Sequence, residues 1–422
     1  MKKRFVHTPE GVRDIYGPEY MKKLAIEDLL HTKFRSFGYQ DIQTPTFEFF
    51  DVFSREIGTT PSKELYKFFD KEGNTLVLRP DFTPSIARCA AKYFMEESLP
   101  VRFCYSGNTF TNTSNLQGKL KEVTQMGVEL IGDASVEADA EAIALVITSL
   151  LSTGLQNFQI SIGDVEFFKG LCREAGLSEE TELALRDVIS EKNHFGAEDL
   201  LIRENIPENY RKSLLKVTEL FGNYEAIEEA AKLVQNSVSK EALSRLEKLY
   251  ERLKAYHVDK YVSFDLGLLS KYHYYTGIIF KAYTYGIGDA IVKGGRYDSL
   301  LEKFGKTSPA IGFVIVVDDV LEALSRQNID IDIQTNDTLI VYFDSTYTKA
   351  LKKSFELREK GICVTLFPCS AIPDGKDCES AYEIYETYAR SSHFARILFV
   401  EEDNIRETLL TTTGRMEENW HE

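Results

Sequence analysis

Hydrophobic and polar positions alternate along residues 123–131, which read V-T-Q-M-G-V-E-L-I. In an extended strand one face would carry Thr124, Met126, Val128 and Leu130, and the other Gln125, Gly127 and Glu129. A buried amide and carboxylate need hydrogen-bonding partners, and a cationic ligand with an amine would supply them. The alternation is also typical of a strand with one solvent-exposed face, and the strand taken alone favours that simpler interpretation.

Helical periodicity over residues 18–37, ended by Gly38, precedes a strand-like segment at 39–50. Pro45 stops this strand because proline removes a hydrogen-bond donor and belongs at a strand end or a sheet edge. A long helix followed by an edge strand is typical of a dimer interface, although helix-on-sheet packing explains the same pattern. A second clear helix is predicted over 135–152.

A strand-to-helix junction follows the segment T-L-V-L-R, with a helix expected from about Ser85. Arg79, Asp81 and Thr83 lie at this junction, where polar side chains and unpaired amides converge on ligands or cap the helix. The next strand, V-R-F-C-Y-S-G, forms a predicted hairpin with residues 123–131. Its polar loop is longer than the usual two to five residues, which indicates a functional loop.

Residues 168–258 are charged, helical in pattern and free of strand signals, and we interpret them as a helical insertion. Strand patterns return in four segments: Y-V-S-F-D-L-G-L-L, H-Y-Y-T-G-I-I-F-K-A-Y, D-A-I-V-K-G-G-R-Y-D and A-I-G-F-V-I-V-V. Strands joined by short turns predict an antiparallel sheet covered by helices. Tyr275 and Gly277 would share one strand face, as a ligand contact or as ordinary core, and Gly294 with Gly295 would form a bulge or a flat pocket wall.

The polar and acidic residues 326–337 predict a linker between two domains. The first domain, 1–325, holds the antiparallel sheet. In the second, 338–422, strand and helix patterns alternate, which predicts a small α/β domain with parallel strands.

Composition narrows the class of protein. Of the 422 residues, 43% are hydrophobic and 27% charged, as in soluble globular proteins. We find no apolar run near the roughly 18 residues that a membrane span needs. The N-terminal basic residues precede no apolar stretch, so we expect a cytoplasmic protein without a secretory signal. The formal net charge of −16 opposes non-specific attraction to nucleic acid.

The six cysteines and seven histidines are dispersed, without a C-x-x-C or H-E-x-x-H spacing. Neither a disulfide framework nor a zinc site is indicated, and we expect no metal. The sequence also lacks G-x-G-x-x-G, P-loop and nucleophile-elbow motifs, so it predicts no cofactor.

Five segments carry a resemblance to a known family: L-R-P-D-F-T-P, Y-S-G-N-T-F, T-Q-M-G-V-E, H-Y-Y-T-G and K-G-G-R-Y-D. In this order they resemble histidyl-tRNA synthetase, a class II aminoacyl-tRNA synthetase, over almost the whole chain. The resemblance implies an α+β fold with a six-stranded antiparallel sheet flanked by helices, a helical insertion and a small C-terminal α/β domain like an anticodon-binding domain. It also implies a dimer formed through the first helix and strand. Carried over by motif, the histidine-binding residues would be Asp81 (a glutamate in the synthetases), Thr83, Gln125, Glu129 and Tyr275.

The arginines that such enzymes use to hold ATP are replaced. The synthetases have F-R at Phe110-Thr111, an arginine at Ser270, and a final G-x-x-R where this chain has Val316 and Asp319. Planar, bidentate arginines neutralise phosphate charge during adenylation. Removing one preorganised group of this kind typically lowers a rate by about 10²–10³, so we expect no useful adenylation and no catalytic residue.

A synthetase-like chain with a histidine pocket but no activation site resembles the regulatory subunits of ATP phosphoribosyltransferase, the first enzyme of histidine biosynthesis. That family implies a non-catalytic subunit of a glycosyltransferase complex. Such a subunit assembles with a short-form catalytic subunit, activates it, and transmits feedback inhibition when free histidine binds. Histidine must then have different affinities for two states of the complex. The alternatives are a divergent histidyl-tRNA synthetase and a histidine-binding interaction module with another partner.

Overall fold

The structure, a computed structural model, describes residues 6–53, 60–96, 99–113, 120–269, 274–331, 333, 338–369, 378–392 and 394–410. They divide into two compact units, Met1–Ile331 and Asp332–Glu422. The boundary between the units falls inside residues 326–337, the segment that the sequence indicates as a linker.

The first unit is built on a nine-stranded sheet with the order β1-β5-β6-β12-β11-β10-β7-β9-β8. The strands are β1 (Gln40–Asp41), β5 (Val101–Phe110), β6 (Glu122–Ile131), β12 (Ala310–Val316), β11 (Val292–Arg296), β10 (Ile278–Thr284), β7 (Phe158–Asp164), β9 (Val262–Asp265) and β8 (Phe221–Gly222). The six strands from β5 to β7 pair antiparallel, whereas β1 pairs parallel with β5 and β9 pairs parallel with β7. Strand β8 pairs antiparallel with β9. The predicted antiparallel sheet is therefore confirmed.

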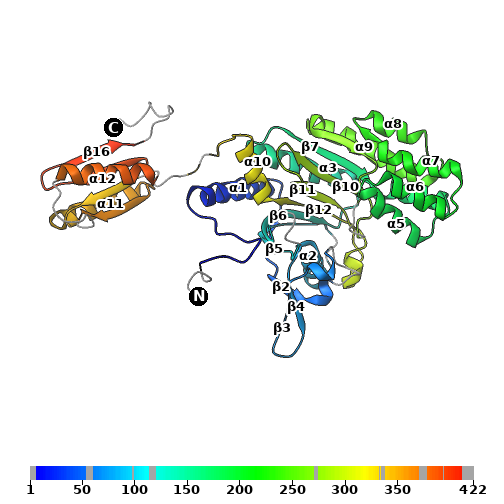
Figure 1. Cartoon of the computed structure of the whole chain (residues 1–422), viewed down its shortest axis with the longest axis horizontal. Helices are drawn as coiled ribbons and strands as arrows, with labels where there is room; N and C mark the ends of the chain where they lie inside the picture. The colour runs from blue at the N-terminus through cyan, green and yellow to red at the C-terminus, as the bar shows by residue number, and fades with distance from the viewer. Residues whose placement is uncertain are drawn as a thin grey trace. The chain divides into compact units, whose positions relative to one another are not determined.

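Three helices cover one face of this sheet: α1 (Gly17–Ser36), α3 (Val136–Ser152) and α10 (Val317–Arg326) (Figure 1). Helix α1 has a proline in its first turn and ends where Gly38 adopts a left-handed φ of 83°. Asp318 joins α1, α10 and β6, because its carboxylate accepts from Lys23 Nζ at 2.8 Å and from the Thr124 amide at 2.6 Å.

Helix α2 (Thr83–Tyr93) packs on the opposite face. A separate three-stranded sheet of β2 (Phe47–Phe49), β4 (Thr75–Leu78) and β3 (Lys67–Phe69) lies beside α2 (Figure 1). The single strand predicted over 39–50 is wrong, since β1 and β2 belong to different sheets. Pro45 lies between them, and the backbone carbonyls of Thr44 and Pro45 turn toward the Arg79 guanidinium. The chain changes sheets where proline breaks the ladder.

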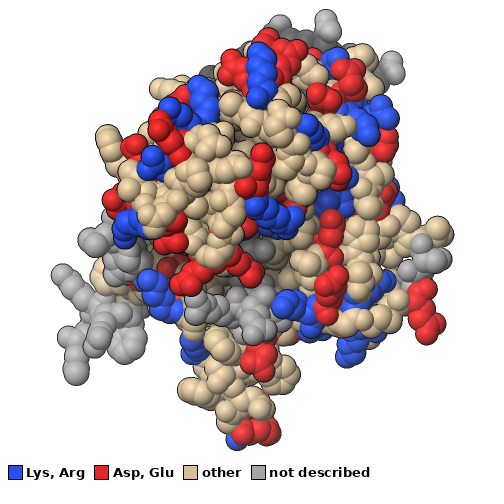
Figure 2. Space-filling model, turned by 90° about the vertical axis from the view of Figure 1, so that its right-hand side faces the viewer, with Lys and Arg blue, Asp and Glu red and all other residues tan. Residues whose placement is uncertain are grey.

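After β7 the chain forms the helices α4 to α9, which group together (Figure 1, green). They are α4 (Val165–Glu174), α5 (Glu179–Ser190), α6 (His194–Arg203), α7 (Glu208–Lys216), α8 (Glu225–Ala231) and α9 (Ser237–Ala255). The expectation that this region lacks strands is wrong in one detail, because β8 adds two residues to the sheet edge. Basic and acidic side chains are interspersed on the face in Figure 2.

Short 3-10 turns connect these elements at Phe50–Phe53, Ser62–Glu64, Val217–Glu219, Asp259–Tyr261 and Leu301–Phe304, and one lies in the second unit at Asp344–Thr346. No helix among the described residues is both long enough and apolar enough to cross a membrane.

The second unit contains β13 (Thr338–Tyr342), α11 (Tyr347–Glu359), β14 (Val364–Pro368), α12 (Cys378–Ser391), β15 (Arg396–Val400) and β16 (Ile405–Leu409). Strands β14, β13 and β15 are parallel, as the alternating pattern predicts. Strand β16, absent from the prediction, pairs antiparallel with β15 at the sheet edge. Three of the five residues in its sequence, I-R-E-T-L, are polar, and Arg406, Glu407 and Leu409 are exposed, so the segment carries little hydrophobic signal.

Candidate functional site

The five residues proposed from the sequence line one cavity of about 160 Å³. Asp81 and Thr83 come from the start of α2, Gln125 and Glu129 from β6, and Tyr275 from the segment before β10. Elements separated by some 190 residues thus meet over the sheet face that α2 covers. The idea that the polar face of β6 is exposed to solvent is wrong, because Glu129 is only 1% exposed.

A row of glycines makes room for the Glu129 carboxylate. Gly312 on β12 lies directly opposite Glu129, and Gly295 on β11 lies opposite Gly312. A Cβ atom at Gly312 would lie 1.7 Å from Glu129 Oε2, and one at Gly295 would lie 2.7 Å from the Tyr275 ring. The bare backbone at these two positions therefore defines the cavity floor.

Two hydroxyl groups hold the Glu129 carboxylate. Thr83 Oγ1 donates to Oε1 at 2.7 Å, and Tyr297 Oη donates to Oε2 at 2.5 Å. Burial raises the pKa of Glu129 to about 8, although both hydrogen bonds act to lower it, and the nearby Asp81 adds to the rise. Glu129 is therefore a carboxyl group that a cationic ligand would help to ionise.

Gln125 Oε1 and Tyr105 Oη, on this side of the sheet, are among the polar atoms that are buried without a hydrogen-bond partner in the described part of the chain. Gln125 lines the cavity. The Tyr105 ring stacks on Phe82 with the ring centroids 4.4 Å apart. Its hydroxyl oxygen would lie only 2.4 Å from a Cβ atom at Gly127. Because buried polar atoms in native proteins nearly always have a hydrogen-bond partner, we expect a ligand amine or imidazole N–H to donate to Gln125 Oε1.

Tyr275 reaches the cavity from a bend and not from a strand. The prediction that Tyr275 and Gly277 share a strand face is wrong, since β10 begins at Ile278. Between them, Thr276 bends back: its amide donates to the Arg296 carbonyl, and its hydroxyl accepts from the Asp298 amide at 2.9 Å. The tyrosine ring lies against Gly295.

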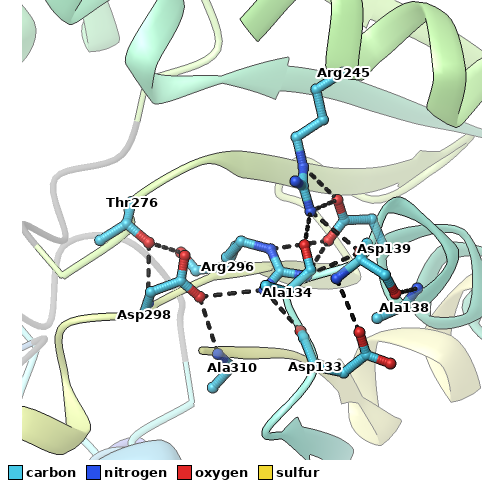
Figure 3. A network of polar contacts seen from close by, with 10 residues as sticks. Asp133, Ala134, Ala138, Asp139, Arg245, Thr276, Arg296, Asp298 and Ala310 are labelled. Atoms are coloured by element: carbon cyan, nitrogen blue, oxygen red, sulfur yellow. Dashed lines mark hydrogen bonds and ion pairs between the residues drawn. The ribbon is translucent and has the colours of Figure 1, made fainter. Parts of the chain in front are cut away.

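A buried ion-pair network fixes the end of β11 beside the cavity (Figure 3). The Arg296 guanidinium donates to Asp139 on α3 at 3.0 and 2.6 Å and to Asp298 at 3.2 Å, and Arg245 on α9 binds the other Asp139 oxygen. Burial acts to lower the pKa of Arg296, but Asp139 and Asp298 raise it overall. The segment G-G-R-Y thus combines a bare floor, an anchored arginine and the tyrosine that binds Glu129.

Tyr297 and Gly312 are the site residues that sequence reasoning missed. Tyr297 follows Gly295 by two positions, so continuing the strand alternation through K-G-G-R-Y places both on the cavity face. Gly312 carries no signal of its own, because its role depends on its register with Glu129.

A wider groove of about 2080 Å³ adjoins the cavity and shares six of its lining residues, which are Thr60, Thr111, Val123, Gln125, Lys293 and Val316. Thr111, Val316 and Asp319, which stand at replaced synthetase positions, line this groove. Burial raises the pKa of Asp319 to about 6, although Lys293 acts to lower it. Ser270 lies outside the described residues. The Arg79 guanidinium is bound to the backbone carbonyls of Thr44 and Asn108 and serves the fold.

Comparison with known proteins shows the family to which this chain belongs. The family model described as histidyl-tRNA synthetase matches residues 11–320. The structure is similar to that of histidyl-tRNA synthetase from a Nostoc species, with a TM-score of 0.78 at 18% identity over 96% of both chains, which shows the shared fold. The protein therefore has the class II synthetase-like architecture that the motifs imply.

Relatives with higher sequence identity show which family within this fold the chain belongs to. The ATP phosphoribosyltransferase regulatory subunit of Acetivibrio thermocellus is 44% identical over 85% of this chain and 86% of its own. That of Ruminiclostridium cellulolyticum is 38% identical over 94% and 93%. A Bacillus halodurans structure described as an ATP phosphoribosyltransferase regulatory subunit/histidyl-tRNA synthetase has a TM-score of 0.82 at 33% identity, covering 93% and 97%. The chain belongs to the family of ATP phosphoribosyltransferase regulatory subunits.

Proposed function

We propose that this chain is the histidine-sensing subunit of ATP phosphoribosyltransferase. It assembles with a short-form catalytic subunit, activates it, and transmits inhibition when free histidine occupies the cavity. The observation that carries the proposal is the Glu129 carboxyl, buried at the floor of the cavity and bound by Thr83 and Tyr297. Because burial raises its pKa, this carboxyl group is largely uncharged near pH 7, and a positively charged ligand would favour its ionised form.

The polar groups around the cavity match a small zwitterion with a second basic group. Glu129 and Asp81 offer carboxylates to an ammonium or imidazolium group, and Gln125 Oε1 offers an acceptor that has no donor among the described residues. Thr83 positions the Glu129 carboxylate, and the Tyr275 ring closes the cavity beside Gly295. A cavity of about 160 Å³ suits a free amino acid better than a nucleotide.

The groove beside the cavity supports a role other than adenylation. Thr111 and Asp319 occupy positions where an activating enzyme would place arginines, and Asp319 adds negative charge where phosphates would lie. Lys293 also lines the groove, but a carboxylate at Asp319 cannot stabilise the negative charge that develops in adenylation. Histidine-dependent exchange of pyrophosphate into ATP would instead favour the divergent histidyl-tRNA synthetase.

Dimerisation through α1 and β1 and the division into domains 1–325 and 338–422 are part of the proposal. Helix α1 exposes Tyr20, Leu24 and Leu29, which are 45%, 46% and 37% exposed, and β1 is an edge strand. Exposed apolar side chains on a helix beside an open sheet edge are typical of a surface that a second copy covers. Sedimentation of Leu24→Glu as a monomer, with the wild type as a dimer, would support this interface.

The assay for the proposal mixes the purified chain with a purified short-form ATP phosphoribosyltransferase. We expect turnover to rise on mixing and to fall again when histidine is added. A mixture that shows neither effect would remove the proposal, and capture of a different cytoplasmic partner would favour a separate histidine-binding module.

A further inference from the structure

Three side chains with metal-binding donor atoms converge on the sheet face opposite the cavity. They are His31 on α1, Asp41 on β1 and Cys104 on β5, and their donor atoms all lie within 4.8 Å of one another. Tyr105, the neighbour of Cys104, stacks on Phe82 on the cavity face, so alternation along β5 directs Cys104 to the other face. The sequence spacing gave no sign of this cluster, because the three residues span 74 positions of the chain.

The backbone fixes the relative positions of these residues. Asp41 and Cys104 are direct partners in the parallel pair of β1 and β5, and the Ile42 amide donates to the Cys104 carbonyl at 2.9 Å. The turn at Gly38 reverses the chain after α1, which brings His31 over β1. Ligands on a helix and two paired strands are held more rigidly than ligands on loops.

The donor atoms already lie close to metal-binding distances. His31 Nε2 is 2.5 Å from Asp41 Oδ1, and Cys104 Sγ is 3.5 Å from the same oxygen. In a tetrahedral zinc complex, bond lengths of about 2.0–2.3 Å place neighbouring donors roughly 3.3–3.8 Å apart. The sulfur–oxygen distance fits, and the nitrogen–oxygen distance must open by about 1 Å. The side chains of His31 and Asp41 are 36% and 57% exposed, so they are free to make this adjustment.

We infer that His31, Asp41 and Cys104 form a binding site for a borderline-soft divalent cation such as Zn²⁺. The metal replaces the hydrogen bond between His31 and Asp41 with one bond to each residue, and the Cys104 thiol releases its proton to solvent as the metal–sulfur bond forms. The exposed sides of His31 and Asp41 leave the fourth position open in the single chain, and in the proposed dimer this position lies at the surface formed by α1 and β1. Thiolate and imidazole select Zn²⁺ or Co²⁺ over Mg²⁺ and Ca²⁺, which prefer all-oxygen ligands.

Two local features limit the affinity of this site. Burial raises the pKa of Cys104 to about 12, and the charge of Asp41 adds to the rise. The Arg35 side chain, one helical turn after His31, acts on both Asp41 and Cys104 and repels a cation. A metal ion must therefore bind sulfur strongly to displace the thiol proton.

The test titrates Co²⁺ into the untagged full-length protein and records its absorption spectrum, with Zn²⁺ calorimetry in parallel. We expect one equivalent of Co²⁺ to produce a thiolate-to-cobalt charge-transfer band that Zn²⁺ abolishes. Cys104→Ala should remove the band, and His31→Asn should weaken metal binding by at least about tenfold. Because His31 is at the surface, the second variant tests the site even if the first folds poorly.

Cys89→Ala is the matched control, since Cys89 is a half-exposed thiol on α2, away from the cluster. It should leave both the band and the Zn²⁺ affinity unchanged. The inference is overturned if the wild type gives no charge-transfer band, if the band survives Cys104→Ala, or if His31→Asn binds Zn²⁺ as tightly as the wild type.

Discussion

Replacing Glu129 with glutamine tests the proposed histidine site through both charge and pH. Glutamine keeps the shape of the side chain and an oxygen that accepts from Thr83 or Tyr297, but it removes the carboxylate. A hydrogen bond between a charged pair contributes about 1.5–3 kcal/mol net, so we expect histidine to bind Glu129→Gln about 10- to 150-fold more weakly once the wild-type group is ionised.

The size of this effect depends on pH because the empty site holds a proton. With the pKa of Glu129 raised to about 8 by burial, the carboxyl is about 90% protonated near pH 7. Histidine must displace that proton, which costs the wild type about 1.4 kcal/mol at pH 7 and little at pH 8.5. The ratio of the two affinities should therefore shrink roughly tenfold between pH 8.5 and pH 7.

Isothermal titration calorimetry with histidine at both pH values measures this ratio. In the wild type near pH 7, the apparent enthalpy should also vary with the ionisation enthalpy of the buffer, because a proton is released on binding. Glu122→Gln is the matched control, since Glu122 lies on the same strand and binds Asn108 outside the cavity. Equal histidine affinities for Glu129→Gln and the wild type at pH 8.5 would refute the reasoning and move the sensor elsewhere.

Three further measurements test the cavity and the buried ion pair between Lys23 and Asp318. Gly312→Ala places a Cβ atom 1.7 Å from Glu129 Oε2, so calorimetry should show at least about tenfold weaker histidine binding. Gly288→Ala is the control, because its Cβ atom would meet open space, and it should bind histidine as the wild type does. Lys23→Met leaves the buried Asp318 carboxylate without its cation. Urea unfolding should show that the free energy of unfolding falls by about 3–5 kcal/mol. A decrease below about 1 kcal/mol would contradict a stabilising buried ion pair. The pKa of Glu129 is about 8 in the folded protein and 4.5 in the unfolded chain. Its protonation therefore stabilises the ligand-free fold fully below pH 4.5, and this contribution is lost as the pH rises through 8. The free energy of unfolding of Glu129→Gln, measured against pH, should lack this decrease.

The parts of the fold with strong periodicity were predictable from the sequence. The antiparallel sheet, α1, α3 and the helical region appear where the patterns of hydrophobic residues place them. Errors occur where long-range pairing outweighs local pattern: residues 39–50 divide between two sheets at Pro45, and β16 exists because β15 offers it an open edge.

The cavity was predictable in part. The resemblance to histidyl-tRNA synthetase, carried over motif by motif, named five of the residues that line it, whereas strand alternation alone favoured a solvent-exposed face for Gln125 and Glu129. Tyr297 and Gly312 depend on register across β11, β12 and β6, and no property of the single sequence states that register. The Arg296 network joins β11 to α3 and α9, so its role too becomes visible only in three dimensions (Figure 3).

The most direct test of the central claim is the histidine inhibition curve of the reconstituted complex. Purified short-form ATP phosphoribosyltransferase is assayed at about pH 8.5 with the wild-type chain or with Glu129→Gln, over a range of histidine concentrations. We predict that the wild-type chain raises turnover and confers inhibition, and that the variant complex needs at least about tenfold more histidine for half inhibition. Superimposable inhibition curves for the two complexes, or no activation by the wild-type chain, would contradict the account.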